Sequence, residues 1–576
     1  MGNHHTTVTG TTFSAKLWHN TWKYLLFAAS LAATFKILFF GFDIDEQYAV
    51  SMAYRMVRGD RMFLEMWEPH QTSAFFSAAF LWIFVHITGG LSYSVLFLRF
   101  IGCLTQLLIS IFLYHTFRKI STPNTAFIVA IFYYNTIPKN SAVPDFSNML
   151  LWFSTLMFLC LLHFSYTETA DNHITIFWLI LSGILTSALI LSYPTCLLVV
   201  IPVATGIYFV SQQHILRNIA CYLSTCFACG AVWLCYFLSH MSFSDFCSGV
   251  SAMFSDGSHS DTFCDKIMNN LSYFRDLLPY VILAFFAAWI LQNIAKFLLK
   301  KKYNYELFLI FAFAIEQLWV WYRMQKRLNF PGILSFFLLF LAFRYHRLYK
   351  ENTSDKKALH ISLYFFGCIT SLFLLFASFL ASNTQLYEAI GYVTIGILVF
   401  FYYYFEKAQI DHLFLKKIVI YSIIGIAILH KGFYIAHLYG HDTVFVTRQK
   451  AESGPMAGIY GRYSDGYEYN LRNEILHAYI PDESKVLLVS NKTIAYLQGN
   501  YDVCNYSTIS TPTIDTQLFT YWNLFSNKIP EYIIWDKIAE GYVAADQSVN
   551  ERLLSSTELL VDTGDLQIYK VLSDSF

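Results

Sequence analysis

Long apolar stretches, separated by short polar turns, occupy the first three quarters of the chain. A helix that crosses a bilayer needs about 20 mainly apolar residues, and thirteen of the stretches come close to that length. We expect each to form a membrane-spanning helix, and together they predict an α-helical polytopic membrane protein. The thirteen predicted spans are Tyr24–Gly41, Ser94–Phe117, Thr125–Pro138, Met149–Tyr166, Ile174–Leu191, Cys196–Val210, Ile219–Leu238, Leu277–Leu299, Leu307–Trp321, Gly332–Phe343, Ile361–Ala381, Leu386–Phe405 and Ile418–Leu438.

One further apolar stretch, Thr72–Ile87, is expected to lie along the membrane surface. The span Ser94–Phe117 follows it almost at once and ends at Arg118 and Lys119. If both stretches crossed the membrane, this basic pair would face outward, whereas an excess of Lys and Arg is typical of cytoplasmic loops. We therefore predict an interfacial helix at Thr72–Ile87, inside a first external loop of residues 42–93.

The charges between the spans predict the orientation of the chain. Met1–Asn20 lacks the basic, apolar and small-residue order of a cleaved signal peptide, so we expect the first helix to remain and the N-terminus to be cytoplasmic. An odd number of spans then puts the C-terminus outside the plasma membrane. The turns that become cytoplasmic carry the basic residues that the positive-inside rule requires, namely Arg217, Lys300–Lys302, Arg344, Arg347, Lys350, Lys356, Lys357, Lys407, Lys416 and Lys417.

From about Gly440 the sequence becomes polar and mixed, with Gly, Asp, Asn and Thr clusters between short apolar runs. This change predicts two domains: a transmembrane domain of residues 1–439 and an extracytoplasmic soluble α/β domain of residues 440–576. Within the second domain we predict strands at Lys485–Ser490 and Glu531–Asp536, a hairpin at Leu559–Leu572 and a helix at Leu471–Ala478. It carries no Gly-rich phosphate loop or catalytic signature, so a compact cap is the favoured interpretation.

Composition agrees with a membrane protein and excludes one class of partner. Of the 576 residues, 56% are hydrophobic and 14% are charged, which is too few charges to cover a soluble protein of this length. The formal net charge is zero. Nucleic-acid binding needs a clustered basic face, so we exclude it.

Three carboxylates lie within four residues just after the first span: Asp43, Asp45 and Glu46. One explanation is structural, because acids in the first turn of a helix cap free amides and favour the helix dipole. A cap accounts for one carboxylate but has no use for three at a membrane boundary. A catalytic or metal-binding role for Asp45 and Glu46 is the second explanation.

The segment Asp45-Glu46-Gln47-Tyr48-Ala49 resembles the acidic-pair motif that follows the first helix of GT-C membrane glycosyltransferases. The similarity is to the branch of protein O-mannosyltransferases and lipid A aminoarabinose transferases (ArnT-like), and in motif detail it covers Tyr24 to Asp145. That family also builds its first external loop from interfacial helices. The resemblance implies an inverting transfer of sugar from a polyprenyl phosphate, with Asp45 as the base and Glu46 orienting Asp45 or the acceptor, or with these two roles exchanged.

Three further residues in this region are candidate contacts. The resemblance implies a role for Asp145, which would bind a divalent cation or the acceptor; capping of the helix that starts near Ser147 explains it equally well. His70 lies where relatives carry a proline-rich element with a nearby His, although this chain lacks the double proline. His70 and Tyr48 are therefore predicted substrate contacts, and metal use is left open because it varies across the superfamily.

A second cluster of charges follows the ninth span. Arg323, Lys326 and Arg327 fall outside the membrane in the predicted topology, against the charge rule. A wrong topology or snorkelling to lipid headgroups would explain them; the alternative is a clamp for the donor phosphate, because Arg forks fit phosphate oxygens. Glu316, inside the span, is a possible substrate contact that could pair with Arg323. Lys36, in the first span, is expected to snorkel outward.

These patterns favour an enzyme of the cell envelope that transfers a sugar from a polyprenyl-phosphate donor to a glycan, lipid or protein acceptor. A polytopic transporter is an alternative, but it would carry its ionisable residues near the bilayer midplane in broken or repeated helices. A polymerase or ligase using polyprenyl donors would instead depend on basic and His residues in a large late loop. A non-catalytic assembly protein with an external domain is the remaining alternative.

Overall fold

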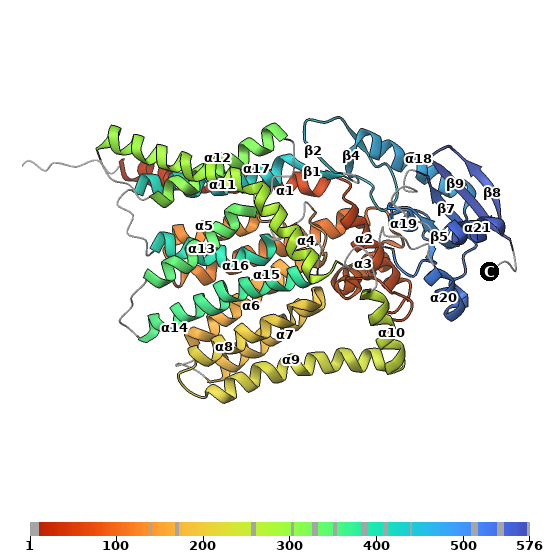
Figure 1. The fold of residues 1–576 in the computed structure, drawn as a ribbon, viewed down its shortest axis with the longest axis horizontal. Helices are drawn as coiled ribbons and strands as arrows, with labels where there is room; N and C mark the ends of the chain where they lie inside the picture. Colours follow the sequence, from red (N-terminus) through yellow and green to blue (C-terminus); the bar gives the residue numbers. More distant parts are fainter. Residues whose placement is uncertain are drawn as a thin grey trace, which may run out of the picture.

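A computed structural model describes most of the chain. The described residues are 11–138, 141–167, 172–254, 261–300, 305–324, 332–348, 354–381, 390–406, 413–437, 440–508, 516–537 and 547–572. Figure 1 shows two parts, a bundle of long helices and a smaller domain with a β-sheet at one end of the bundle. This architecture confirms the predicted fold class.

Each predicted span overlaps a helix of the bundle. Lipid offers the backbone no hydrogen-bond partners, so a spanning segment must satisfy its N–H and C=O groups within its own helix. The bundle helices are α1 (Thr11–Phe39), α4 (Ser94–Arg118), α5 (Pro123–Asn135), α6 (Phe146–Thr167), α7 (Asn172–Ser192), α8 (Val200–Val210), α9 (Ile215–Leu238), α11 (Phe263–Leu299), α12 (Tyr305–Met324), α13 (Gly332–Leu348), α14 (Ser354–Ser362) continued by η3 (Leu363–Ile369, a π-helix) and α15 (Thr370–Ala381), α16 (Ile390–Glu406) and α17 (Leu413–Phe433). The short η2 (Pro194–Val199) precedes α8.

The first loop contains α2 (Ile44–Val57), η1 (Gln71–Ser73) and α3 (Ala74–Thr88). By length and composition alone, Gln71–Thr88 is one of eight segments among the described residues that could cross a membrane. Figure 1 places α2 and α3 at the end of the bundle, next to the smaller domain. On α3, Trp82 and Ile87 are exposed apolar side chains, which suits a helix lying in a membrane interface. The position of α3 relative to the membrane stays a prediction.

The polar loop predicted between the spans of α9 and α11 is largely helical. α10 (Phe243–Phe254) follows α9, and α11 begins at Phe263, well before the predicted start of its span. Thr262 accepts a hydrogen bond from the backbone N–H of Asp265, whose side chain accepts one from the N–H of Thr262. This reciprocal capping box starts a helix regardless of how polar the first turns are, and the apolar pattern alone does not reveal it.

The C-terminal domain is built on a five-stranded sheet in the order β6-β5-β7-β9-β8. β5 is parallel to β6 and β7, whereas β9 is antiparallel to β7 and β8. The predicted strands, hairpin and helix all have counterparts here. The elements are β5 (Lys485–Val489), β6 (Asp502–Val503), β7 (Tyr532–Asp536), β8 (Thr557–Asp562), β9 (Leu566–Val571), α18 (Tyr463–Tyr479), α19 (Ala495–Gln498), α20 (Thr516–Leu524), η5 (Ser526–Lys528) and α21 (Gln547–Ser555), preceded by the hairpins β1 (Tyr434–His437) with β2 (Gly440–Thr443) and β3 (Arg448–Lys450) with β4 (Tyr460–Arg462).

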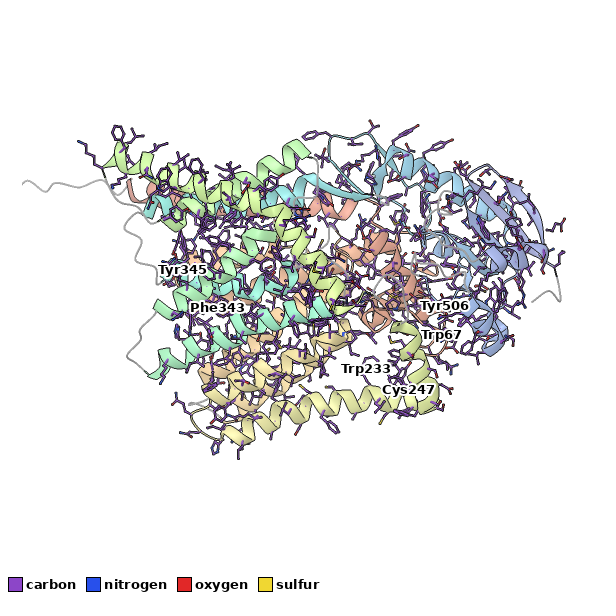
Figure 2. The ribbon with its side chains drawn as sticks, viewed as in Figure 1. Trp67, Trp233, Cys247, Phe343, Tyr345 and Tyr506 are labelled. Atoms are coloured by element: carbon purple, nitrogen blue, oxygen red, sulfur yellow. The ribbon has the colours of Figure 1, made fainter. Side chains whose placement is uncertain are left out.

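The first loop and the C-terminal domain share an apolar core. Val50 and Ala53 of α2 belong to the same buried cluster as Val486 of β5 and Ile534 of β7. Figure 2 shows Trp67 beside Tyr506 at this junction; their ring centroids lie 5.9 Å apart. The domain is therefore packed onto the first loop.

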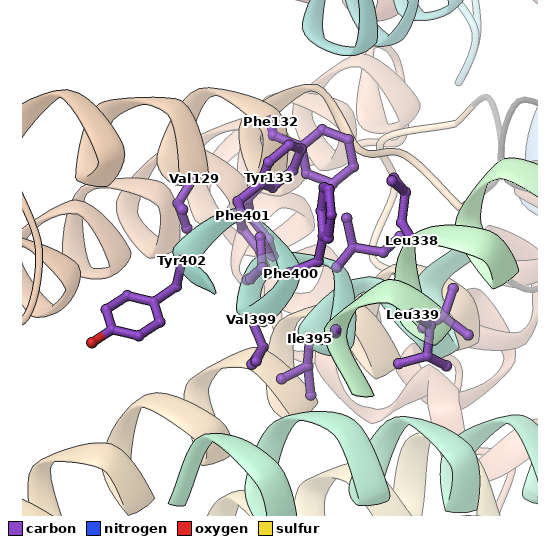
Figure 3. Packing of buried hydrophobic residues seen from close by; sticks show 14 of the residues in the cluster. Val129, Phe132, Tyr133, Leu338, Leu339, Ile395, Val399, Phe400, Phe401 and Tyr402 are labelled. Carbon is purple, nitrogen blue, oxygen red and sulfur yellow. The ribbon is translucent and has the colours of Figure 1, made fainter. Parts of the chain in front are cut away.

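The core of the bundle is rich in aromatic side chains. Phe401 of α16 packs edge-on against Phe132 of α5, with ring centroids 4.9 Å apart. Figure 3 shows Phe400 and Phe401 between α5 and the leucines Leu338 and Leu339 of α13. Large rigid rings bury much surface at little cost in conformational entropy, so this packing fixes the helices that carry the site described next.

Candidate active site

The acidic segment forms the first turn of α2, directly after α1. Gly41 has φ 101, which lets the chain turn sharply between the two helices. Asp43 is the N-cap of α2, and its carboxylate accepts a hydrogen bond from the backbone N–H of Glu46 at 3.0 Å. The capping explanation thus applies to Asp43 and leaves the other two acids to be accounted for.

Glu46 makes a buried ion pair with Arg99 of α4. Arg99 Nε donates to Glu46 Oε1 at 2.7 Å, a second guanidinium N–H donates to Oε2, and the Ser141 hydroxyl donates to Oε1 at 3.0 Å. The exposed fraction is 0% for Glu46 and 2% for Arg99. Removing one partner of such a pair leaves an uncompensated buried charge, which costs about 3–5 kcal/mol. Glu46 therefore fixes the start of α2 to α4.

Arg99 also holds the end of α1. Its remaining N–H groups donate to the backbone carbonyls of Ile37, Leu38, Phe40 and Gly41 at 2.7–3.3 Å. These carbonyls end a helix and have no partner within it. One guanidinium thus joins α1, α2 and α4 where the acids lie.

Asp45 faces a different side of α2 from Glu46. Successive helix residues are about 100° apart around the axis, whereas residues three apart share a face, so Asp45 lies on the face of Tyr48. Asp45 is half-buried. The Tyr48 hydroxyl donates to the carbonyl of Pro69 at 2.6 Å. This face of α2 therefore looks toward the Pro69–His70 segment.

His70 connects that segment to the start of α6. Its ring stacks on Phe146, with centroids 4.1 Å apart and planes 7° apart, and lies 5.7 Å from the ring of Tyr193. His70 has φ 61, an uncommon backbone conformation for a residue other than glycine, and the stacking holds it there. Tyr48, His70 and the start of α6 thus form one continuous set of contacts.

Asp145 caps α6. Its carboxylate accepts from the backbone N–H of Asn148 at 2.7 Å and from the Ser147 hydroxyl at 3.0 Å, and the residue is buried. This is the structural alternative considered for Asp145, and a role in binding metal or acceptor stays a prediction. Within the described ranges, no group of three or more His, Cys, Asp or Glu side chains is placed to hold a metal ion.

Two buried lysines lie at the same end of the bundle. Lys36 of α1 donates to the carbonyl of Tyr434 and is 6% exposed. It does not snorkel outward as expected, because that carbonyl draws its ammonium group into the protein. Lys431 of α17 donates to the carbonyl of Tyr134 at 2.9 Å, lies 4.1 Å from the centroid of the Tyr134 ring and is 3% exposed.

A small cavity of about 20 Å³ lies between α1, α4, α5, α6 and α17, and Lys431 lines it together with Thr34, Gln106 and Asn148. Its wall includes Ala142, the neighbour of the Ser141 that contacts Glu46.

Of the two lysines, Lys431 is among the residues that line this cavity and Lys36 is not. Glu46 pairs with Arg99, and Asp442 pairs with Arg448. Neither Lys36 nor Lys431 has a carboxylate partner within the described part of the chain. A buried ammonium group without an anion is costly. Each of the two ammonium groups instead donates to a main-chain carbonyl, Lys36 to Tyr434 and Lys431 to Tyr134.

The second predicted cluster is only partly described. Arg323 lies in the last turn of α12, and its side chain is outside the description, as are Lys326 and Arg327 as whole residues. Glu316 is buried in α12, and its carboxylate oxygens have no hydrogen-bond partner among the described residues. Its predicted pairing with Arg323 stays a prediction.

Arg99 and Lys431 are not part of any motif, yet the sequence does carry a signal for them. Both are basic residues inside predicted spans, where an ionisable side chain is expensive and usually functional. Their partners come from distant segments, so the pattern along the chain could mark the residues but not their contacts.

No protein-family model and no curated protein match this chain. Solved structures of similar arrangement include the Archaeoglobus fulgidus oligosaccharyltransferase in complex with zinc and sulfate, at TM-score 0.48 and 10% identity over 95% of this chain and 73% of that one. ArnT from Cupriavidus metallidurans bound to undecaprenyl phosphate has TM-score 0.44 and 9% identity over 96% and 99% of the two chains. The oligosaccharyltransferase AglB from Archaeoglobus fulgidus, in complex with an inhibitory peptide and a dolichol-phosphate, has TM-score 0.41 and 10% identity over 98% of this chain and 75% of that one. ArnT and the oligosaccharyltransferase AglB are GT-C proteins.

Proposed function

We propose that this protein is an inverting glycosyltransferase that moves a sugar from a polyprenyl phosphate to an acceptor hydroxyl on the extracytoplasmic face of the membrane. One observation carries the proposal: the three acids of the first loop have separate surroundings. Asp43 caps α2, Glu46 is paired with Arg99, and Asp45 lies on the face toward Tyr48 and His70. The pair and the cap hold the turn in place, and Asp45 lies half-buried on the face of α2 that is directed toward the Pro69–His70 segment.

In the proposed reaction Asp45 acts as the general base. It takes the proton from the acceptor hydroxyl as that oxygen attacks the anomeric carbon of the donor sugar. The bond between this carbon and the phosphate oxygen breaks, its electron pair leaves with the polyprenyl phosphate, and the configuration at the carbon inverts. Glu46 orients the turn through Arg99 and does not exchange the proton.

Lys36 and Lys431 are our candidates for the group that receives the departing phosphate. Cations placed before the reaction where negative charge develops stabilise the transition state without reorganisation. The cluster of Arg323, Lys326 and Arg327 stays a second candidate for this contact. Tyr48, His70, Asp145 and Glu316 remain predicted contacts of sugar or acceptor.

The test measures sugar transfer from radiolabelled polyprenyl-phosphate sugars in membranes that contain the wild type or a variant. Asp45→Asn should lower the rate by about 10²–10⁴-fold, the contribution usual for a general base. Asp43→Asn is the matched control: asparagine caps helices as well as aspartate does, so its rate should stay close to that of the wild type.

Glu46→Gln distinguishes the two acids. It should lower the amount of folded protein, because Arg99 loses its counter-charge, and the protein that does fold should keep more activity than Asp45→Asn. Full activity of Asp45→Asn at normal protein levels would refute the catalytic assignment.

A further inference from the structure

Arg55 lies near the end of α2, where its side chain is fully buried among acceptors from the rest of the first loop. Its guanidinium donates to Asp60 and to Glu68, each at 2.8 Å, and to the carbonyl of Glu65 at 2.6 Å. Its exposed fraction is 0%. The planar fork of arginine meets three acceptors at once, which the point charge of lysine cannot do. Arg55 thus joins α2 to the segment that follows it.

The C-terminal domain completes this network. Arg55 also donates to the carbonyl of Tyr506 and to the Tyr521 hydroxyl, both at 3.4 Å. The Tyr521 hydroxyl donates to the carbonyl of Glu65 at 2.8 Å, and Thr508 Oγ1 donates to Glu68 Oε2 at 2.8 Å. Residues more than 400 positions apart therefore meet around one guanidinium.

The charges of the network balance only while Arg55 is present. Arg55 and Lys528 of η5 face the carboxylates of Asp60 and Glu68. Glu68 is fully buried, and this burial raises the pKa of its carboxyl although Arg55 and Thr508 donate to it. Without Arg55, Glu68 keeps no ion-pair partner among the described residues. A buried carboxylate without a counter-charge destabilises the folded arrangement around it.

The network also leads to the candidate active site. Glu68 directly precedes Pro69 and His70 in the chain. Pro69 receives the hydrogen bond of Tyr48, which shares a face of α2 with Asp45. Arg55 thus contacts both elements that carry candidate site residues here: α2 and the segment Glu68–His70.

We propose that Arg55 is a positioning residue through which the C-terminal domain holds α2, and with it Asp45, against the Pro69–His70 segment; the catalytic part of this inference rests on the function proposed above. A displacement of about 1 Å between reacting groups is enough to cost about 100-fold in rate. The domain therefore takes part in forming the site although it contributes no reacting group.

The first measurement is hydrogen exchange of the full-length protein in detergent, followed on peptides that cover α2 and residues 64–73. Arg55→Met should make both regions exchange at least about tenfold faster, because the buried network opens locally. Arg58→Met is the matched control on the same helix. Arg58 pairs with Asp502 of the domain at 2.8 Å but is 27% exposed, so its loss should leave the exchange unchanged.

The second measurement separates kcat from KM for a polyprenyl-phosphate sugar. Arg55→Met should lower kcat at least tenfold while KM for the donor stays within about twofold, because a misplaced base weakens the transition state and not the binding of donor. Arg55→Lys should not restore kcat. If Arg55→Met does not fold, Thr508→Val and Tyr521→Phe each remove one hydroxyl of the network and should shift exchange and kcat in the same direction by a smaller factor.

Unchanged exchange in α2 for Arg55→Met, or for both milder variants, would overturn the inference whether or not the protein transfers sugar. Faster exchange at unchanged kcat would overturn the positioning role. If the wild-type protein transfers no sugar, the proposed function is refuted. Faster exchange of Arg55→Met would then leave Arg55 only its role in attaching the domain.

Discussion

Asp45 and Glu46 are neighbours in the sequence, yet the fold gives them separate surroundings. A helix turns about 100° per residue, so one side chain enters the contact with Arg99 while the other stays on the side of Tyr48. The sequence predicted that this pair matters but left open which acid does what. The proposed division of roles rests on Arg99, a residue 53 positions from Glu46 that pairs with it.

At the residue scale, the buried lysines give a direct prediction. Lys36→Met or Lys431→Met should raise KM for the donor by about tenfold, because each removes one positive charge from the site proposed for the phosphate. Steady-state kinetics at varied donor concentration measures this. Lys537→Met is the control: this half-exposed lysine pairs with Asp562 at the end of the edge strand β8, so its loss should leave KM unchanged. A wild-type KM in both buried-lysine variants would contradict the phosphate site.

At the scale of elements, apolar length predicts this protein well because lipid forces a spanning segment to be helical. The strands β5 and β7 were predictable for a similar reason, since they are short apolar runs buried on both faces of a sheet. The polar start of α11 was missed, because it depends on a capping box and not on hydrophobicity.

Gly102 tests how closely two elements must approach. A Cβ at this position of α4 would lie 1.6 Å from the carbonyl oxygen of Ala142, next to the Ser141 that contacts Glu46. Gly102→Ala should therefore push α4 and this segment apart and destabilise the protein by about 1–3 kcal/mol. Thermal unfolding followed by tryptophan fluorescence in detergent measures the loss.

The matched control for this substitution is Gly230→Ala in α9. A Cβ there meets nothing within 4 Å, so the unfolding temperature should not fall. Equal unfolding temperatures for the Gly102→Ala variant and the wild type would mean that the contact between α4 and Ala142 is loose.

At the scale of the whole molecule, the sequence predicted two parts but not how they join. The contacts of Arg55 with Tyr506 and Tyr521 link positions about 450 residues apart, and neither end carries a motif. Such pairs are set by the folded shape alone. The pattern along the sequence therefore marks the acidic turn but not its contacts with the C-terminal domain.

The predicted orientation can be tested on the whole chain by cysteine labelling. In a variant whose exposed Cys235, Cys247 and Cys264 are replaced by serine, Thr88→Cys and Phe445→Cys should react with a membrane-impermeant maleimide in intact cells. Lys119→Cys should react only after permeabilisation, because the positive-inside rule puts the end of α4 in the cytoplasm. Labelling of position 119 in intact cells would reverse the topology and place the acidic turn on the cytoplasmic side.

The pairing of Arg99 also constrains how the chain is assembled. An arginine in an apolar helix opposes entry into the bilayer, at a cost of about 3 kcal/mol at the helix centre. Arg99 lies in the second turn of α4, from which a long side chain can reach the headgroups while the helix inserts. The Arg99 guanidinium is buried from water only when Glu46 and the carbonyls at the end of α1 cover it. Biogenesis therefore has an order: α4 must be inserted before the first turn of α2 can settle, and an unfinished chain carries two exposed, unmatched charges at this point.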